Sequence, residues 1–168
     1  MTLQIDDAGV GDLLLGAVIG MYRPESDEFS YDMVGIEYFT NPKFSKKHYL
    51  RRTSEIVSSI LERIKIGPDE EIQICSSFIL ELAAKDLRRR FGEERVKITK
   101  ITGEAQKHAE TAYLDEIRNI GYEPLPDRET RRARSFFHML RWVKDNPTRI
   151  RYVKTGWPKL RRYIRIKT

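Results

Sequence analysis

Two adjacent carboxylates followed by a glycine-rich turn are the residues of this sequence best suited to chemistry. Asp6 and Asp7 follow a short apolar segment, Leu3–Ile5, and precede Gly9 and Gly11. Hard divalent cations such as Mg²⁺ or Mn²⁺ take oxygen ligands, and Mg²⁺ keeps several waters, so one or two carboxylates on a rigid strand can hold a cation. Glycines at such a turn allow positive φ or a close approach of the backbone to a ligand. The alternative is an ordinary hairpin turn, in which Asp hydrogen-bonds its own backbone.

A second polar stretch, residues 102–111, opens a predicted helix and is placed to complete such a site. Glu104 and His108 lie four residues apart and therefore on one helix face. A stripe of small side chains allows this helix to approach the sheet closely, formed by Ala105, Ala109 and Ala112. Glu104 would then be a metal ligand beside Asp6, and His108 a ligand or a proton carrier. The alternative is a helix-end role for Glu104, favoured there by the helix dipole, and a solvated His108.

The single cysteine limits the other chemistries. Cys75 excludes an internal disulfide and a cysteine-rich zinc site. Cys75 and Ser76 stand at a predicted strand end, but no histidine lies near them in the sequence to activate a nucleophile. Core packing and helix capping are the roles expected for them.

The spacing of apolar residues predicts the elements that must position these groups. Strands are expected at 3–5, 13–22, 29–39, 71–75 and 96–101, and helices at 50–64, 78–91 and 104–119. The order is three strands, then helix, strand, helix, strand, helix. Short turns between the first strands predict an antiparallel meander, and right-handed crossovers place helices on both faces of the later parallel strands. The expectation is an α/β fold with a mixed five-stranded sheet.

Beyond this body the chain becomes strongly basic. From Arg128 to Thr168 there are 14 Lys or Arg against two acids, a local net charge of +12, so the first 127 residues carry 6 − 12 = −6. One more helix is expected at 130–144, and 149–168 predicts a short strand, an ordered arm or a flexible tail. We therefore expect a domain at 1–124 and a basic C-terminal appendage at 125–168.

The charge segregation predicts a polyanionic partner for the appendage. Basic side chains bind phosphates and aromatic faces stack on unpaired bases, so nucleic acid, either RNA or DNA, is the expected partner. An acidic protein, or pairing with the acidic body, are the alternatives. The residues expected to contact nucleic acid are Arg131, Arg132, Arg134, Arg149, Arg151, Tyr152, Trp157, Arg161 and Arg162.

The run Asp6-Asp7-Ala8-Gly9-Val10-Gly11, followed by Gly16-Ala17-Val18-Ile19, resembles the opening motif of type 2 ribonuclease H. That family begins with Asp-Glu-Ala-Gly-Arg-Gly, then a glycine and an apolar strand, and the order of elements is similar to that of the ribonuclease H-like superfamily. The resemblance implies a ribonuclease H-like fold, metal binding by Asp6, a catalytic role for Asp7, and contacts of Gly9 and Gly11 with a nucleic-acid backbone.

The sequence departs from the family at two places. Val10 stands where the family has arginine, a residue tied to ribonucleotide recognition, and Cys75-Ser76-Ser77 stands where an aspartate is expected after the fourth strand. Two-metal phosphoryl chemistry needs several negative ligands. A site without that aspartate would bind one metal, recruit another residue, or be inactive.

These features predict a metal-dependent nuclease-like protein that acts on phosphodiesters with Mg²⁺ or Mn²⁺. Asp6, Asp7 and Glu104 are the expected metal ligands, and these three with His108 the expected catalytic residues. A catalytically inactive module that binds nucleic acid or joins an assembly is the alternative. No apolar run approaches the roughly 20 residues that span a bilayer, and no signal peptide opens the chain, so no membrane association and a cytoplasmic location are expected.

Overall fold

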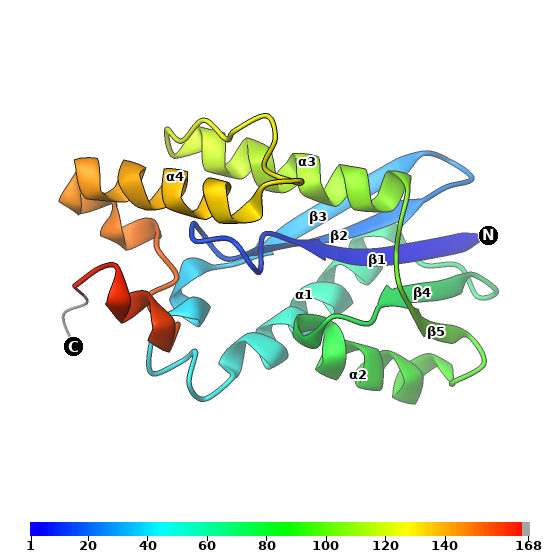
Figure 1. The fold of residues 1–168 in the computed structure, drawn as a ribbon. Helices are drawn as coiled ribbons and strands as arrows, with labels where there is room; N and C mark the ends of the chain where they lie inside the picture. The colour runs from blue at the N-terminus through cyan, green and yellow to red at the C-terminus, as the bar shows by residue number, and fades with distance from the viewer. Residues whose placement is uncertain (166–168) are drawn as a thin grey trace.

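The computed structural model describes residues 1–165. Residues 166–168, the end of the range 149–168 for which a strand, arm or tail is predicted, therefore lie outside the described residues. Residues 1–165 form an α/β fold around one mixed sheet with helices on both faces, as the sequence predicts (Figure 1).

The sheet has five strands in the order β3-β2-β1-β4-β5. Their bounds are β1 Thr2–Ala8, β2 Ala17–Arg23, β3 Glu28–Val34, β4 Glu71–Cys75 and β5 Val96–Thr99. The first three form the expected antiparallel meander, while β4 pairs parallel to β1 and to β5. Because β1 lies at the centre and parallel to β4, the carboxyl ends of these two strands meet at one edge of the sheet.

Two hydrophobic cores lie on the two faces of the sheet. Helices α1 (His48–Ile64) and α2 (Glu81–Phe91) pack on one face over Leu3, Ile5 and Ile74. Helix α3 (Glu104–Asn119) packs on the other face through the predicted small-residue stripe, in which Ala109 is fully buried. Figure 1 shows α3 and α4 on one side of the sheet and α1 and α2 on the other. The three body helices begin and end close to the predicted positions.

The second and third strands are shorter than predicted, for reasons visible in the packing. Residues 13–16 form a bend rather than the start of β2, because Leu13 and Leu14 are buried under the C-terminal part of the chain and Leu15 has a φ of 58°. Residues 36–39 form a short 3₁₀ helix, η1 (Ile36–Phe39), which buries Phe39 in the core instead of extending β3.

The basic C-terminal segment is packed against the body. It contains α4 (Arg132–Asp145) and two 3₁₀ helices, η3 (Pro147–Tyr152) and η4 (Pro158–Arg162), with Val153 forming an isolated β-bridge to Leu14. Its apolar residues join the same core as the bend after β1, through Met139, Leu140, Val143, Val153 and Leu160. Among the described residues no helix is long and apolar enough to cross a bilayer.

Candidate carboxylate site at the end of β1

The carboxyl end of the central strand opens into a concave pocket of about 680 Å³. Its floor is formed by the end of β1 and the turn after it, residues 6–12, with Cys75 and Ser77 from the end of β4. One wall comes from α3 and another from the segment leading into α4. The acidic and basic side chains lining it are Asp6, Asp7, Asp12, Glu110, Glu129, Lys100, Lys107 and Arg132.

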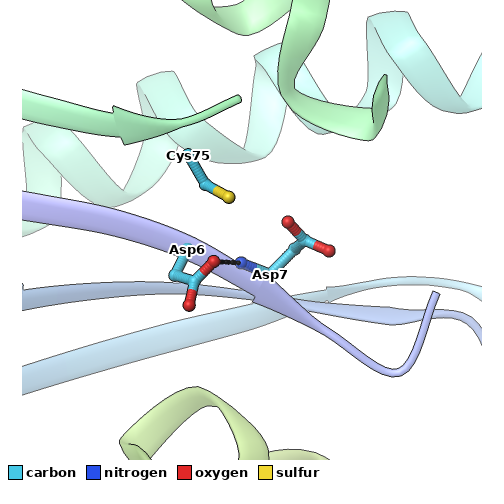
Figure 2. A group of neighbouring side chains, drawn as sticks. All are labelled: Asp6, Asp7 and Cys75. Atoms are coloured by element: carbon cyan, nitrogen blue, oxygen red, sulfur yellow. Dashed lines mark hydrogen bonds between the residues drawn. The ribbon is translucent and has the colours of Figure 1, made fainter. Parts of the chain in front are cut away.

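Asp6 and Asp7 lie together with Cys75 at this edge (Figure 2). One ligand atom from each residue lies within 4.8 Å of the others. The Asp7 amide donates to Asp6 Oδ1 at 2.9 Å, and Ser77 Oγ donates to Asp7 Oδ1 at 2.5 Å, so both carboxylates are oriented. Within residues 1–165 neither carboxylate forms an ion pair with a basic side chain.

Burial makes the negative charges of Asp6 and Asp7 costly, because no basic side chain among the described residues pairs with them. It raises the pKa of Asp6 to about 6 and also raises the pKa of Asp7, although the hydrogen bonds from the Asp7 amide and Ser77 act in the opposite direction. Burial and the neighbouring Asp6 raise the pKa of the Cys75 thiol, which keeps it protonated at neutral pH. A bound cation would compensate both aspartates.

The two glycines of the turn after β1 differ in what the fold requires of them. Gly9 has a φ of +85°, and a Cβ there would lie 2.3 Å from the Tyr113 ring, so both conformation and packing require glycine. Gly11 is exposed, lines the pocket, and a Cβ there would meet nothing within 4 Å. The fold therefore requires glycine at position 9, while position 11 has open space beside it.

A fully buried lysine from the C-terminal segment holds this turn. Lys154 Nζ donates to the carbonyls of Gly9, Asp12 and Leu14 at 2.9, 2.7 and 3.1 Å. An ammonium has three donors, which these three carbonyls satisfy. Burial lowers the pKa of Lys154 to about 7. Its backbone N–H also donates to Leu13 O at 3.0 Å, so strand end and C-terminal segment are joined twice.

A buried arginine pairs with the remaining pocket acids. Arg128, only 5% exposed, pairs with Asp12 and Glu110, and with Glu129 at 2.9 Å. Among the described residues, Asp6 and Asp7 are therefore the pocket carboxylates that form no ion pair. Sequence reasoning missed Arg128 and Lys154, because nothing local distinguishes them from the other basic residues of the segment.

The structure brings Glu110, rather than Glu104 or His108, to the pocket. Glu104 pairs with Lys107 at 3.2 Å in the first turn of α3, and neither Glu104 nor His108 is among the residues that line the pocket. His108 instead stacks on Phe29, with ring centroids 5.0 Å apart. The reason is rotational: with the alanine stripe on the sheet, the Glu104–His108 face turns toward the β2–β3 hairpin. Glu110, one residue beyond Ala109, turns toward the end of β1.

The predicted nucleic-acid residues are divided between internal contacts and open surface. Three pair with acids: Arg131 and Arg134 with Asp127, and Arg132 with Glu129. Two cover aromatic rings: Arg149 lies 4.2 Å from the Trp142 ring and Arg151 4.8 Å from the Tyr152 ring. Trp157 is half-buried beside Lys154. Arg161 and Arg162 are exposed, and within residues 1–165 they form no ion pair.

Compared with protein-family models, with curated proteins and with solved structures, the chain gives no significant match.

Proposed function

We propose that this chain is a ribonuclease H-like protein that cleaves nucleic-acid phosphodiesters with a divalent cation held by Asp6 and Asp7. The observation that carries the proposal is the uncompensated, oriented carboxylate pair at the carboxyl end of the central strand, facing a pocket. The strand order and the resemblance of the opening motif support the same family.

The donor set fits a hard cation such as Mg²⁺ or Mn²⁺. Asp6 and Asp7 offer oxygen ligands, and Mg²⁺ is commonly held by one or two carboxylates with waters completing its shell. The protonated Cys75 thiol is a soft group that such a cation does not need. When bound, the cation would activate water and stabilise the leaving oxygen.

The chain's own residues would bind and orient the substrate. Lys100, Lys107 and Arg132 line the pocket and can hold phosphate oxygens. Gly11 leaves open space in which a sugar–phosphate backbone can approach. Arg128 reduces the repulsion between a polyanion and the pocket by pairing with Asp12, Glu110 and Glu129. Lys154 fixes the turn that carries Gly9 and Gly11.

The test is cleavage of labelled oligonucleotides by the wild type and two matched variants. Single-stranded RNA, single-stranded DNA, an RNA–DNA hybrid and DNA with one embedded ribonucleotide are each incubated with Mg²⁺, Mn²⁺ or EDTA. We expect metal-dependent cleavage of at least one substrate, reduced about 100-fold or more in Asp6→Asn, which corresponds to loss of about 2.7 kcal/mol of transition-state stabilisation. Asp115→Asn, an exposed carboxylate on α3, should retain activity. Equal cleavage by Asp6→Asn would overturn the proposal.

A second candidate function is a catalytically inactive nucleic-acid-binding or assembly module. It is favoured by the absence of a third available carboxylate in the described pocket, because β4 ends in Cys75 and Glu110 is paired with Arg128. The same substrates separate the two when their binding is also measured, by fluorescence anisotropy at low and high salt: salt-sensitive binding without cleavage of any of the four supports the module and removes the nuclease.

A further inference from the structure

Three aromatic rings gather on the surface formed by α4 and η4. Phe137 is 51% exposed and Tyr163 is 38% exposed, and their ring centroids lie 5.7 Å apart. Phe136 contacts both, at 5.2 and 5.5 Å, and is itself half-buried on the core. Phe136 therefore holds the two exposed rings in place against the core. The three rings form one contiguous apolar cluster at the surface, and contiguous exposed apolar patches, unlike single scattered side chains, mark binding surfaces.

Basic side chains without acidic partners among the described residues stand next to these rings along α4 and in η4. Arg141 lies four residues after Phe137, on the same face of α4, and Arg161 and Arg162 directly precede Tyr163. All three are exposed, and in the described part of the chain none forms an ion pair. Between 132 and 165 there are eleven Lys or Arg and one acid, Asp145. This charge is complementary to a polyanion.

The aromatic residues elsewhere in this segment are not free to stack on a ligand in the same way. Arg149 covers Trp142 and donates to its carbonyl at 2.7 Å. Arg151 covers Tyr152. Phe137 and Tyr163 are thus the rings of this segment with the most open surface.

This surface is continuous with the carboxylate pocket along α4. Arg132, in the first turn of α4, lines the pocket, and Phe136 follows one turn later on the same side of the helix. Figure 1 shows α4 running from the region beside the end of β1 toward the C-terminal segment. A chain lying along α4 would reach from the pocket to the rings.

We propose that this aromatic–basic surface, formed by Phe136, Phe137, Tyr163, Arg141, Arg161 and Arg162, binds single-stranded nucleic acid. Aromatic faces stack on unpaired bases, which a duplex keeps within its own stack, while the arginines hold the phosphates between them. The inference deepens the proposed function, since the surface would hold the single-stranded part of a substrate that enters the pocket. Binding at this surface does not itself require Asp6 or Asp7.

The test measures binding of a fluorescein-labelled 20-nucleotide oligo(dT) and of a mixed-sequence duplex by fluorescence anisotropy, with the full chain in EDTA. Phe137→Ala/Tyr163→Ala should weaken binding to oligo(dT) about tenfold or more, because stacking contributes about one tenfold factor or more per base. Phe137→Tyr/Tyr163→Phe keeps both rings and should bind as the wild type does. Arg161→Ala/Arg162→Ala should lower the slope of log K against log salt by about 1.4. Arg89→Ala, an exposed arginine on α2, is the charge control.

Each outcome decides the point. Ring-dependent binding of oligo(dT) with weaker binding of the duplex supports the surface, even where Asp6→Asn leaves cleavage unchanged and the nuclease proposal fails. Equal binding of oligo(dT) by Phe137→Ala/Tyr163→Ala and by the wild type overturns it, even where the nuclease proposal stands. Binding to anionic phosphatidylserine vesicles but not to oligo(dT), or a ring-dependent dimer in light scattering without oligonucleotide binding, also overturns it.

Discussion

At the scale of single residues, Asp6 is the group of the site whose protonation makes the stability of the fold depend on pH. Burial raises its pKa to about 6, from an ordinary value of 3.8. Between these values the folded chain holds a proton that the unfolded chain has released. The raised pKa therefore contributes stability fully below about pH 4, and this contribution is lost as the pH rises through about 6.

Asp6→Asn should consequently be more stable than the wild type at pH 7.5, by up to about 3 kcal/mol, and nearly equal to it near pH 4. Asparagine keeps the shape and the acceptor for the Asp7 amide but carries no charge. Urea unfolding at the two pH values measures the difference, with Asp115→Asn as the exposed control. A difference that does not change with pH would contradict this account.

Millimolar Mn²⁺ extends the same comparison, because a ligand that binds only the folded chain stabilises it. Mn²⁺ should raise the urea concentration at the unfolding midpoint of the wild type at pH 7.5 and leave that of Asp6→Asn nearly unchanged. An equal shift in both would mean that the cation binds elsewhere.

At the scale of elements, Lys154 connects the end of β1 to the C-terminal segment. Lys154→Met fills similar space but leaves the Asp12 carbonyl without a donor, while the Gly9 and Leu14 carbonyls each keep a second one, from the Asp12 amide and the Tyr113 hydroxyl. One unsatisfied buried polar group costs about 1–3 kcal/mol, so the variant should lose about 1–3 kcal/mol of unfolding free energy. Lys159→Met, exposed in the same segment, is the matched control and should change stability by less than about 0.5 kcal/mol.

Hydrogen exchange gives that prediction a local readout. The Asp12 amide, which donates to Gly9 O at 3.1 Å, should exchange faster in Lys154→Met than in Lys159→Met. Unchanged exchange at Asp12 would show that the lysine does not hold the turn.

The positions of most helices and strands can be predicted from the sequence, because a long segment with regular apolar spacing favours one type of secondary structure. The boundaries of β4 and α3 agree with the predicted ranges, and the meander and crossovers set the sheet order. The local sequence pattern could not show which acidic side chain of α3 would face the pocket, since that depends on how the buried alanines set the rotation of the helix about its axis. It also could not show that Leu13 and Leu14 leave the strand, since their partners lie about 140 residues later.

At the scale of the whole molecule, the acidic body and the basic segment share one core. Leu13, Leu14 and Tyr113 from the body pack in the same cluster as Val143 and Val153 from the segment. The Tyr113 hydroxyl donates to Leu14 O at 2.9 Å beneath this cluster. Charge segregation is thus visible in the sequence, whereas the burial that joins the two parts is not.

A chain shortened to residues 1–124 should therefore fail to fold cooperatively. It loses Met139, Leu140, Val143, Val153 and Leu160, each buried and each contributing about 1.5–3 kcal/mol, a sum comparable to the entire stability of a domain of about 5–15 kcal/mol. Near-UV circular dichroism, ANS fluorescence and the sharpness of urea unfolding measure this directly. Co-expression with a separate 125–168 chain should restore the transition, because the contacts it supplies are non-covalent. A cooperative unfolding transition in 1–124 alone would show that the core between α3 and the sheet forms without the basic segment.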